Sequence, residues 1–259
     1  MSFVKVAMTT DFGLNDHYVA VTKAVILNRS KKPVVFLDVS HNVERQNIAK
    51  AAYLCAVSAK HMGKDTIHLV VVDPTVGTDR KIVVFKTENN GIFVAPDNGV
   101  LSHALEWFAG DIYYYITSFE GASKTFHARD IFAPLVAQII NGEGIDAFFI
   151  KTPKTSLVRL KFPEFKLEST SIKGSIIYVD IFGNLITNIP NGVLKEESVQ
   201  LVAKNKRFRI RQCKTYAEGR KDELLLIEGS EGFYEIAINQ SSANKVLQLK
   251  EGDEIVFFR

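Results

Sequence analysis

Apolar residues in the first half of the chain come in short runs that end at polar residues. Residues 3–9, 34–39 and 67–72 are apolar runs that predict strands, and the run at 67–72 shows hardly any alternation between apolar and polar positions. The pattern at 67–72 is typical of a parallel strand buried on both faces. Helical periodicity follows the first two runs, near residues 18–28 and 46–62. Strand, polar turn and helix in this order predict an α/β domain with a mainly parallel central sheet.

The pattern changes beyond residue 80. Residues 82–86 and 92–95 flank Asn89-Asn90-Gly91, and Asn-Gly between apolar runs predicts a tight hairpin. From Gly174 onward the chain consists of short β-rich runs punctuated by Gly, Asn and Pro. This punctuation predicts a smaller all-β domain, an antiparallel barrel or sandwich.

These patterns divide the chain into two domains. We expect the α/β domain over residues 1–165 and the β domain over residues 173–259. Residues 141–172 lose periodicity and contain two prolines, so they form the expected linker or boundary.

Composition narrows the class of protein. Hydrophobic residues make up 46% and charged residues 24% of the 259 residues, as in an ordinary globular protein. A net charge of +3, with no basic stripe interleaved with aromatics, gives no support for a nucleic-acid partner. The N-terminus lacks a signal pattern and no apolar run reaches 18 residues, so we expect a cytoplasmic protein without a membrane segment.

The third apolar run carries the first candidate chemistry. It stops on Asp73-Pro74, and Arg80 follows seven residues after Asp73. Ligands in open α/β sheets bind at the carboxyl ends of the strands, where Asp11, Asp16 and His41 are also expected. A simpler interpretation stays open, in which Asp73 caps the turn and Arg80 is solvated.

Several familiar site motifs do not fit. The sequence has no Walker A loop, no H-E-x-x-H and no G-x-S-x-G, and the GxGxxG-like run at Gly142–Ala147 follows a helix instead of a strand. Asp11, His41, Asp73 and His127 could in principle supply a metal site. No close-spaced ligand pair supports one, so we expect no metal.

Five segments in a fixed order carry a more specific signal. They are TTDFG (9–13), VDPTVGTDR (72–80), PDNG (96–99), TFHARDIFAP (125–134) and DIFGNLITN (180–188). Together they resemble the S-adenosylmethionine hydroxide adenosyltransferase family. Its members are adenosine-forming S-adenosylmethionine hydrolases, and the family is related to the fluorinating and chlorinating enzymes. The resemblance extends over nearly the whole chain, through residues 229–239.

The resemblance implies a reaction and a catalytic set. Asp73, Arg80 and His127 match the Asp, Arg and His that surround a water at C5′ of the substrate's ribose in that family. The water or hydroxide displaces methionine and leaves adenosine, with no metal or cofactor. The negative charge of Asp73 disfavours a halide nucleophile, which argues against a halogenase.

The resemblance also implies substrate-binding residues and an assembly. Asp11 is expected to bind the ribose hydroxyls, Asp16 and Asp180 to lie near the methionine amino end, and Phe182 and Asn184 to contact adenine, with Ser230 and the backbone near Asn239 completing the pocket. Family members form homotrimers with sites between the first domain of one subunit and the second domain of its neighbour.

Two positions depart from the family pattern. Thr75 and Ala128 stand where the family usually has glycine; at a position that requires positive φ, a side chain would cost about 1 kcal/mol. These departures support one alternative, a protein that binds S-adenosylmethionine or adenosine without turnover. A metal-dependent hydrolase that uses the acidic strand ends is the other alternative.

Overall fold

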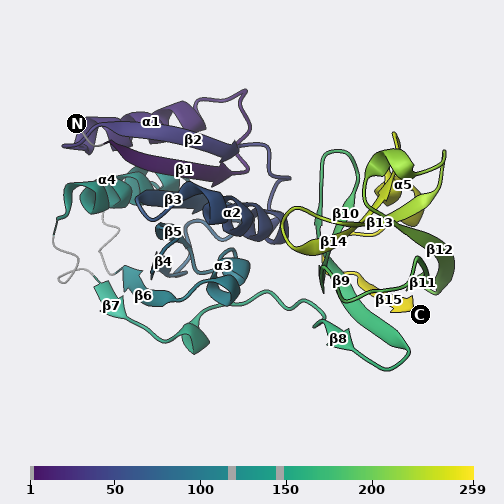
Figure 1. The fold of residues 1–259 in the computed structure, drawn as a ribbon. Helices are drawn as coiled ribbons and strands as arrows, with labels where there is room; N and C mark the ends of the chain where they lie inside the picture. Colours follow the sequence, from purple (N-terminus) through teal and green to yellow (C-terminus); the bar gives the residue numbers. More distant parts are fainter. Residues whose placement is uncertain (1–2, 116–120, 144–148) are drawn as a thin grey trace. The chain divides into compact units, whose positions relative to one another are not determined.

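The computed structural model describes residues 3–115, 121–143 and 149–259 (Figure 1). The chain divides into two compact units, Met1–Leu160 and Lys161–Arg259. Residues 144–148 lie outside the described residues, so most of the Gly142–Ala147 run has no structural description.

A mixed sheet forms the centre of the first unit. Its seven described strands lie in the order β2 (Val34–Ser40), β1 (Val4–Thr10), β3 (Thr66–Val71), β5 (Ile92–Pro96), β4 (Ile82–Thr87), β6 (Gly110–Tyr115) and β7 (Phe149–Lys151). The β2–β1, β1–β3 and β3–β5 pairs are parallel. The β5–β4, β4–β6 and β6–β7 pairs are antiparallel. The expectation of a mainly parallel sheet was therefore wrong.

The hairpin at Asn89-Asn90-Gly91 explains the change of direction. It returns the chain from β4 to β5, so the two strands pair antiparallel. Gly91 has φ of +83°, and a Cβ there would lie 2.1 Å from the carbonyl oxygen of Thr66. Only glycine fits, which fixes the hairpin against the start of β3.

Helices cover both faces of this sheet (Figure 1). One core cluster joins the sheet to α2 (Ile48–Met62) and α3 (Ser102–Trp107). The other joins it to α1 (Tyr18–Arg29), to a π-helical turn η1 (Ala128–Phe132) and to α4 (Ala133–Asn141). Every residue of β3 is buried, as the continuous apolar run predicts for a strand covered on both sides.

The second unit is a closed barrel. Seven strands form the ring: β9 (Ser171–Val179), β10 (Leu185–Pro190), β14 (Phe233–Ile238), β13 (Leu224–Glu228), β12 (Lys206–Cys213), β11 (Ser198–Ala203) and β15 (Glu254–Phe258). The ring closes because β9 pairs with both β15 and β10, and the short β8 (Lys166–Leu167) adds to β9. All these pairs are antiparallel except β12–β13. The smaller all-β domain is confirmed, and of the two predicted forms, barrel or sandwich, it is a barrel, with one parallel pair.

Two short helical elements complete the barrel unit. The 3₁₀ turn η4 (Tyr216–Glu218) lies between β12 and β13, and α5 (Ala243–Leu247) follows β14. No helix in the part of the chain that the structure describes is long and apolar enough to cross a membrane.

Candidate functional site

The segment that follows β3 contains a buried ion pair. Nε of Arg80 donates to Oδ2 of Asp73 at 2.7 Å, and Nη2 lies 2.5 Å from the same oxygen. Only 4% of the Asp73 side chain and 6% of the Arg80 side chain are exposed. Arg80 is therefore buried and paired instead of solvated. Asp73 does cap its turn as well, because Oδ1 accepts from the backbone N of Thr75.

His127 joins this pair through the same guanidinium. Nη2 of Arg80 lies 2.9 Å from Nδ1 of His127. Arginine is always protonated and can only donate, so Nδ1 accepts and the neutral ring carries its proton on Nε2. Burial and the positive charge of Arg80 lower the pKa of His127, against smaller opposing effects of Asp73 and Asp130. The histidine is therefore held in its neutral form.

A π-helical turn places His127 at the edge of the sheet. His127 is the residue before η1, and Asp130 within η1 accepts from the backbone N of Ser123 at 2.9 Å. This contact fixes the approach to the turn. The π-helical turn inserts extra backbone before α4, as is frequent at functional sites.

A small cavity of about 80 Å³ brings three of the predicted residues together. Its lining includes Asp11 from the end of β1, Asp73 from the end of β3, and His127. The backbone N of Gln46 donates to Oδ2 of Asp11 at 3.0 Å and so fixes the carboxylate. Asp16 is exposed in the loop before α1 and does not line this cavity.

One donor of the cluster has no acceptor. Nη1 of Arg80 is buried and has no hydrogen-bond partner among the described residues. The guanidinium carbon lies 5.3 Å from the centre of the Phe132 ring. A buried charged donor without an acceptor is costly and uncommon in folded proteins. Its place beside Asp73 and His127 suits a site where a bound molecule supplies the acceptor.

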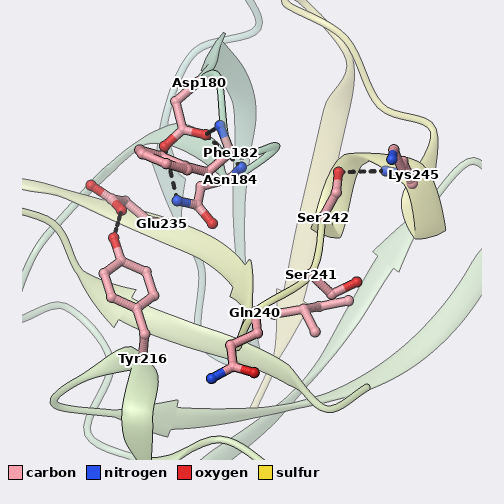
Figure 2. A pocket seen from close by; sticks show the side chains of 10 residues that line it. Asp180, Phe182, Asn184, Tyr216, Glu235, Gln240, Ser241, Ser242 and Lys245 are labelled. Atoms are coloured by element: carbon pink, nitrogen blue, oxygen red, sulfur yellow. Dashed lines mark hydrogen bonds between the residues drawn. The ribbon is translucent and has the colours of Figure 1, made fainter. Parts of the chain in front are cut away.

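The second unit has a larger pocket of about 720 Å³ (Figure 2). Three predicted residues line it: Asp180, Phe182 and Asn184. The Asp180 carboxylate accepts from the backbone N of Phe182 and of Asn184 and from Nδ2 of Asn184, at 2.8–2.9 Å. Asp180 thus holds the β9–β10 turn, from which the Phe182 ring projects with 75% of its area exposed.

A glycine lets this turn approach the neighbouring α5. Gly183 has φ of +83°, and a Cβ there would lie 2.0 Å from Oγ of Ser242. Ser242 caps α5 by accepting from the backbone N of Lys245. The turn and the helix start therefore form one wall of the pocket only because residue 183 is glycine.

Tyr216 and Glu235 also line the pocket, and sequence reasoning missed both. Oη of Tyr216 donates to Oε2 of Glu235 at 2.7 Å, as Figure 2 shows. Burial raises the pKa of Glu235, and the negative charges of Asp180 and Glu231 add to the effect, although the bond from Tyr216 opposes it. A single acidic residue within the apolar run of β14 was the signal that could have found Glu235.

Two predicted residues lie outside this pocket's lining. Ser230 is exposed in the turn between β13 and β14. Nδ2 of Asn239 donates to the carbonyl oxygen of Gly219 at 3.3 Å, so its amide holds the loop before β13.

His41, one of the residues considered for a metal site, makes its own contacts with other side chains. Nδ1 of His41 lies 2.8 Å from Oγ1 of Thr10, and Nε2 lies 3.0 Å from Oδ1 of Asp38. In residues 3–115, 121–143 and 149–259, no group of three or more His, Cys, Asp or Glu is arranged to hold a metal ion.

Family models match both units. The SAM hydroxide adenosyltransferase N-terminal domain matches residues 6–149, and the SAM hydroxide adenosyltransferase C-terminal domain matches residues 174–256. The resemblance found in the sequence is thereby confirmed.

Curated proteins and a solved structure agree with these matches. The (R)-S-adenosyl-L-methionine hydrolase of Methanocaldococcus jannaschii is 32% identical over 262 residues, which cover 96% of this chain and 94% of that protein. The hydrolase of the same name from Thermus thermophilus is 32% identical, with 94% of this chain and 95% of that protein covered. A fluorinase of Actinopolyspora mzabensis is more distant, at 22% identity over 95% of this chain and 94% of that protein. The crystal structure of an uncharacterized conserved protein from Thermotoga maritima superimposes with a TM-score of 0.87 at 36% identity, covering 98% of this chain and all of that one.

Proposed function

We propose that this chain, which belongs to the S-adenosylmethionine hydroxide adenosyltransferase family, hydrolyses S-adenosyl-L-methionine to adenosine and L-methionine. Water or hydroxide attacks C5′ of the ribose. The observation that carries the proposal is the buried cluster of Asp73, Arg80 and His127 beside the cavity that Asp11 lines. Its relatives named as S-adenosylmethionine hydrolases match over nearly their whole length.

The cluster suits a reaction in which a sulfonium leaves. A sulfonium departs as a neutral thioether, so no acid has to protonate it. The protein must instead hold the nucleophile in line with the C5′–S bond. The positive charge of Arg80 favours hydroxide over water, and its buried Nη1 offers a donor for that oxygen. Since Nδ1 of His127 already accepts from Arg80, His127 donates from Nε2 in this arrangement and does not act as the base.

Substrate binding involves both units in this proposal. Asp11 accepts from the ribose hydroxyls, Phe182 and Asn184 contact the adenine, Asp16 and Asp180 lie near the methionine amino group, and Ser230 and Asn239 complete the pocket. The support is strongest for Phe182 and Asn184, because an exposed ring and an amide line the same pocket.

The proposed assembly is a homotrimer in which the first unit of one subunit and the second unit of its neighbour share a substrate. A cavity of about 80 Å³ cannot enclose a nucleoside derivative, because pockets for such ligands measure roughly 300–1,000 Å³. The β9–β10 turn also exposes Ile181 (91%) and Phe182 (75%), two large apolar side chains that a neighbouring subunit would cover.

Mixed subunits test this assembly. At a substrate concentration well below KM, where Phe182→Ala turns over about a tenth as fast as the parent, co-expressed Asp73→Asn and Phe182→Ala chains should turn over faster than either chain alone, because some sites in the mixed trimers combine two intact halves. Light scattering should give the mass of three chains. Absence of any regained turnover in a confirmed mixed oligomer would contradict the shared site.

We place the protein in the cytoplasm, and imaging of a tagged chain in cells tests that location.

Product analysis tests the function. Purified protein is incubated with S-adenosylmethionine without added metal, and the products are separated by chromatography. We expect adenosine and methionine in equal amounts, at a rate that a chelator does not change. Bound substrate without products would favour the non-catalytic binding protein, and loss of activity in chelator would favour the metal-dependent hydrolase.

A further inference from the structure

The Asp73 carboxylate is bound on both oxygens. Arg80 donates from Nε and Nη2 to Oδ2. Thr75 donates from its backbone N at 3.2 Å and from its hydroxyl at 2.9 Å to Oδ1. A carboxylate has about four acceptor positions, two on each oxygen. The side chain of Arg80 and the side chain and main chain of Thr75 therefore fill all four acceptor positions of the Asp73 carboxylate.

The Thr75 contact requires no backbone strain. Thr75 and Ala128 both have negative φ, so neither position needs the left-handed conformation that favours glycine. Where the resembling family usually has glycine after Asp-Pro, this chain gains a hydroxyl at no conformational cost. The sequence-based concern that Thr75 weakens the site does not apply to its backbone.

A second threonine of the same turn makes a different contact. The Thr78 hydroxyl donates to the carbonyl oxygen of Thr75 at 2.7 Å, and the backbone N of Arg80 donates to the Thr78 hydroxyl at 3.4 Å. Thr78 thus connects main-chain groups only. Only the Thr75 hydroxyl, of the two, reaches the Asp73 carboxylate. Substitution of Thr78 therefore tests a role in the turn, and substitution of Thr75 tests a role at the site.

Orientation of the carboxylate depends on the Thr75 hydroxyl. The terminal torsion of aspartate is soft, so the plane of the carboxylate depends on the contacts to both of its oxygens. At Oδ1 the Thr75 hydroxyl is the closer of two donors, at 2.9 Å against 3.2 Å for the backbone N of Thr75, and the two together fix the plane of the group. The Arg80 guanidinium contacts Oδ2 of this carboxylate, and its Nη2 also contacts Nδ1 of His127. A change at Oδ1 therefore moves the guanidinium that holds His127.

We propose that Thr75 is a positioning residue for the hydrolysis, whose hydroxyl sets the orientation of the Asp73 carboxylate and, through Arg80, of His127. This proposal rests on the proposed function. Thr75 does not line the cavity beside Asp73 and His127, so it acts through Asp73 and not by contact with the substrate.

Three variants test the proposal. Thr75→Val removes the hydroxyl at nearly constant volume, and we expect kcat to fall about tenfold with KM nearly unchanged, as for loss of a hydrogen bond to a charged group. Thr75→Ser keeps the hydroxyl and should restore kcat to within about twofold of the parent. Thr78→Val is the matched control: it removes the neighbouring hydroxyl of the same turn, and we expect a lower Tm with a smaller loss of kcat than in Thr75→Val.

Two results would overturn the proposal. One is a Thr75→Val enzyme whose kcat equals or exceeds that of the parent. A higher kcat would mean that the Thr75 hydroxyl competes with the nucleophile for Oδ1 of Asp73 and slows the parent enzyme. The other is equal loss of kcat and Tm in Thr75→Val and Thr78→Val, which would leave Thr75 a role in the turn alone.

Nitrogen NMR of the His127 ring separates this proposal from the proposed function. We expect Thr75→Val, but not Thr75→Ser, to shift the Nδ1 resonance, because Arg80 moves relative to the ring. A parent protein that forms no adenosine refutes the proposed function, and the proposal for Thr75 fails with it. The NMR shift would then still report whether the threonine orients the cluster. Turnover in the parent with no effect of Thr75→Val on kcat and on the resonance refutes only the proposal for Thr75.

Discussion

The two units hold their functional side chains in opposite ways. In the first unit, Asp73, Arg80 and His127 are buried and bonded to one another. In the second unit, the backbone around Phe182 is fixed by Asp180 while the ring itself is largely exposed. Groups that stabilise charge at a reaction centre work best when they are oriented beforehand. A ring that binds a ligand can remain uncovered until the ligand arrives. The comparison predicts that substitutions in the buried cluster of Asp73, Arg80 and His127 change turnover and that substitution of the exposed Phe182 ring changes binding.

The largest expected effect is at the ion pair. Asp73→Asn keeps the shape of the side chain but removes the charge that pairs with Arg80, and we expect kcat to fall about a thousandfold with a small change in KM. Steady-state kinetics measure both parameters. Asp79→Asn is the control, because Asp79 is an exposed acid of the same segment. Equal kinetics for Asp73→Asn and the parent would remove Asp73 from the chemistry.

The next effect tests the other carboxylate of the small cavity. Asp11→Ala removes the proposed acceptor of the ribose hydroxyls, and we expect Kd for S-adenosylmethionine to rise about tenfold to a hundredfold. Calorimetry measures the affinity, in the Asp73→Asn background so that the substrate is not consumed. An unaltered Kd would mean that Asp11 does not bind the ribose.

A smaller effect is expected at the exposed ring of the second unit. Phe182→Ala should raise KM about tenfold and leave kcat within about twofold, because stacking on a base is worth roughly 1–3 kcal/mol. Val246→Ala, an exposed apolar residue of α5, is the control. A kcat that falls as steeply as in Asp73→Asn would contradict the division of roles between the buried cluster and the exposed ring.

The smallest effect concerns pH. Burial and Arg80 lower the pKa of His127 from its ordinary 6.5, so the ring stays neutral at neutral pH. We expect kcat/KM to be flat near neutrality and to fall below pH 6.5, as a proton on Nδ1 removes the acceptor for Arg80. Folding stability should also decrease as pH falls through 6.5, since the unfolded chain then binds the proton more readily than the folded one. A profile measured with the His127→Gln enzyme should lack this acid limb; its persistence would assign the limb to another group.

The fold was predictable where local patterns decide it. Apolar runs predicted β1, β2 and β3, and Asn89-Asn90-Gly91 predicted the hairpin that joins β4 to β5. The direction of the whole sheet was not predictable from the first strands, because β6 and β7 pair antiparallel to their neighbours through contacts between distant segments. The barrel was predictable in kind, but its ring of partners was not.

The site was also predictable only where a local pattern of the sequence indicates it. Asp73 and Arg80 follow the end of a strand, which the sequence alone indicates, whereas the place of His127 beside them was expected only through the family resemblance. Tyr216 and Glu235 meet because η4 precedes β13, which pairs with β14, and no local pattern encodes that contact. The role of Asp11 remains a prediction that the Kd of Asp11→Ala tests, and the roles of Asp16, Asp180, Ser230 and Asn239 remain predictions.

The π-helical turn η1 has a consequence for how this protein tolerates sequence change. Each residue of a helical turn rotates the chain, so the direction in which His127 projects relative to α4 depends on the number of residues between them. Substitutions within η1 keep that number, but deletion of one residue would rotate the imidazole away from Arg80 while α4 itself stays intact. The spacing of this segment is therefore constrained more strictly than its composition, and a scan of single deletions would detect a requirement that a scan of substitutions misses.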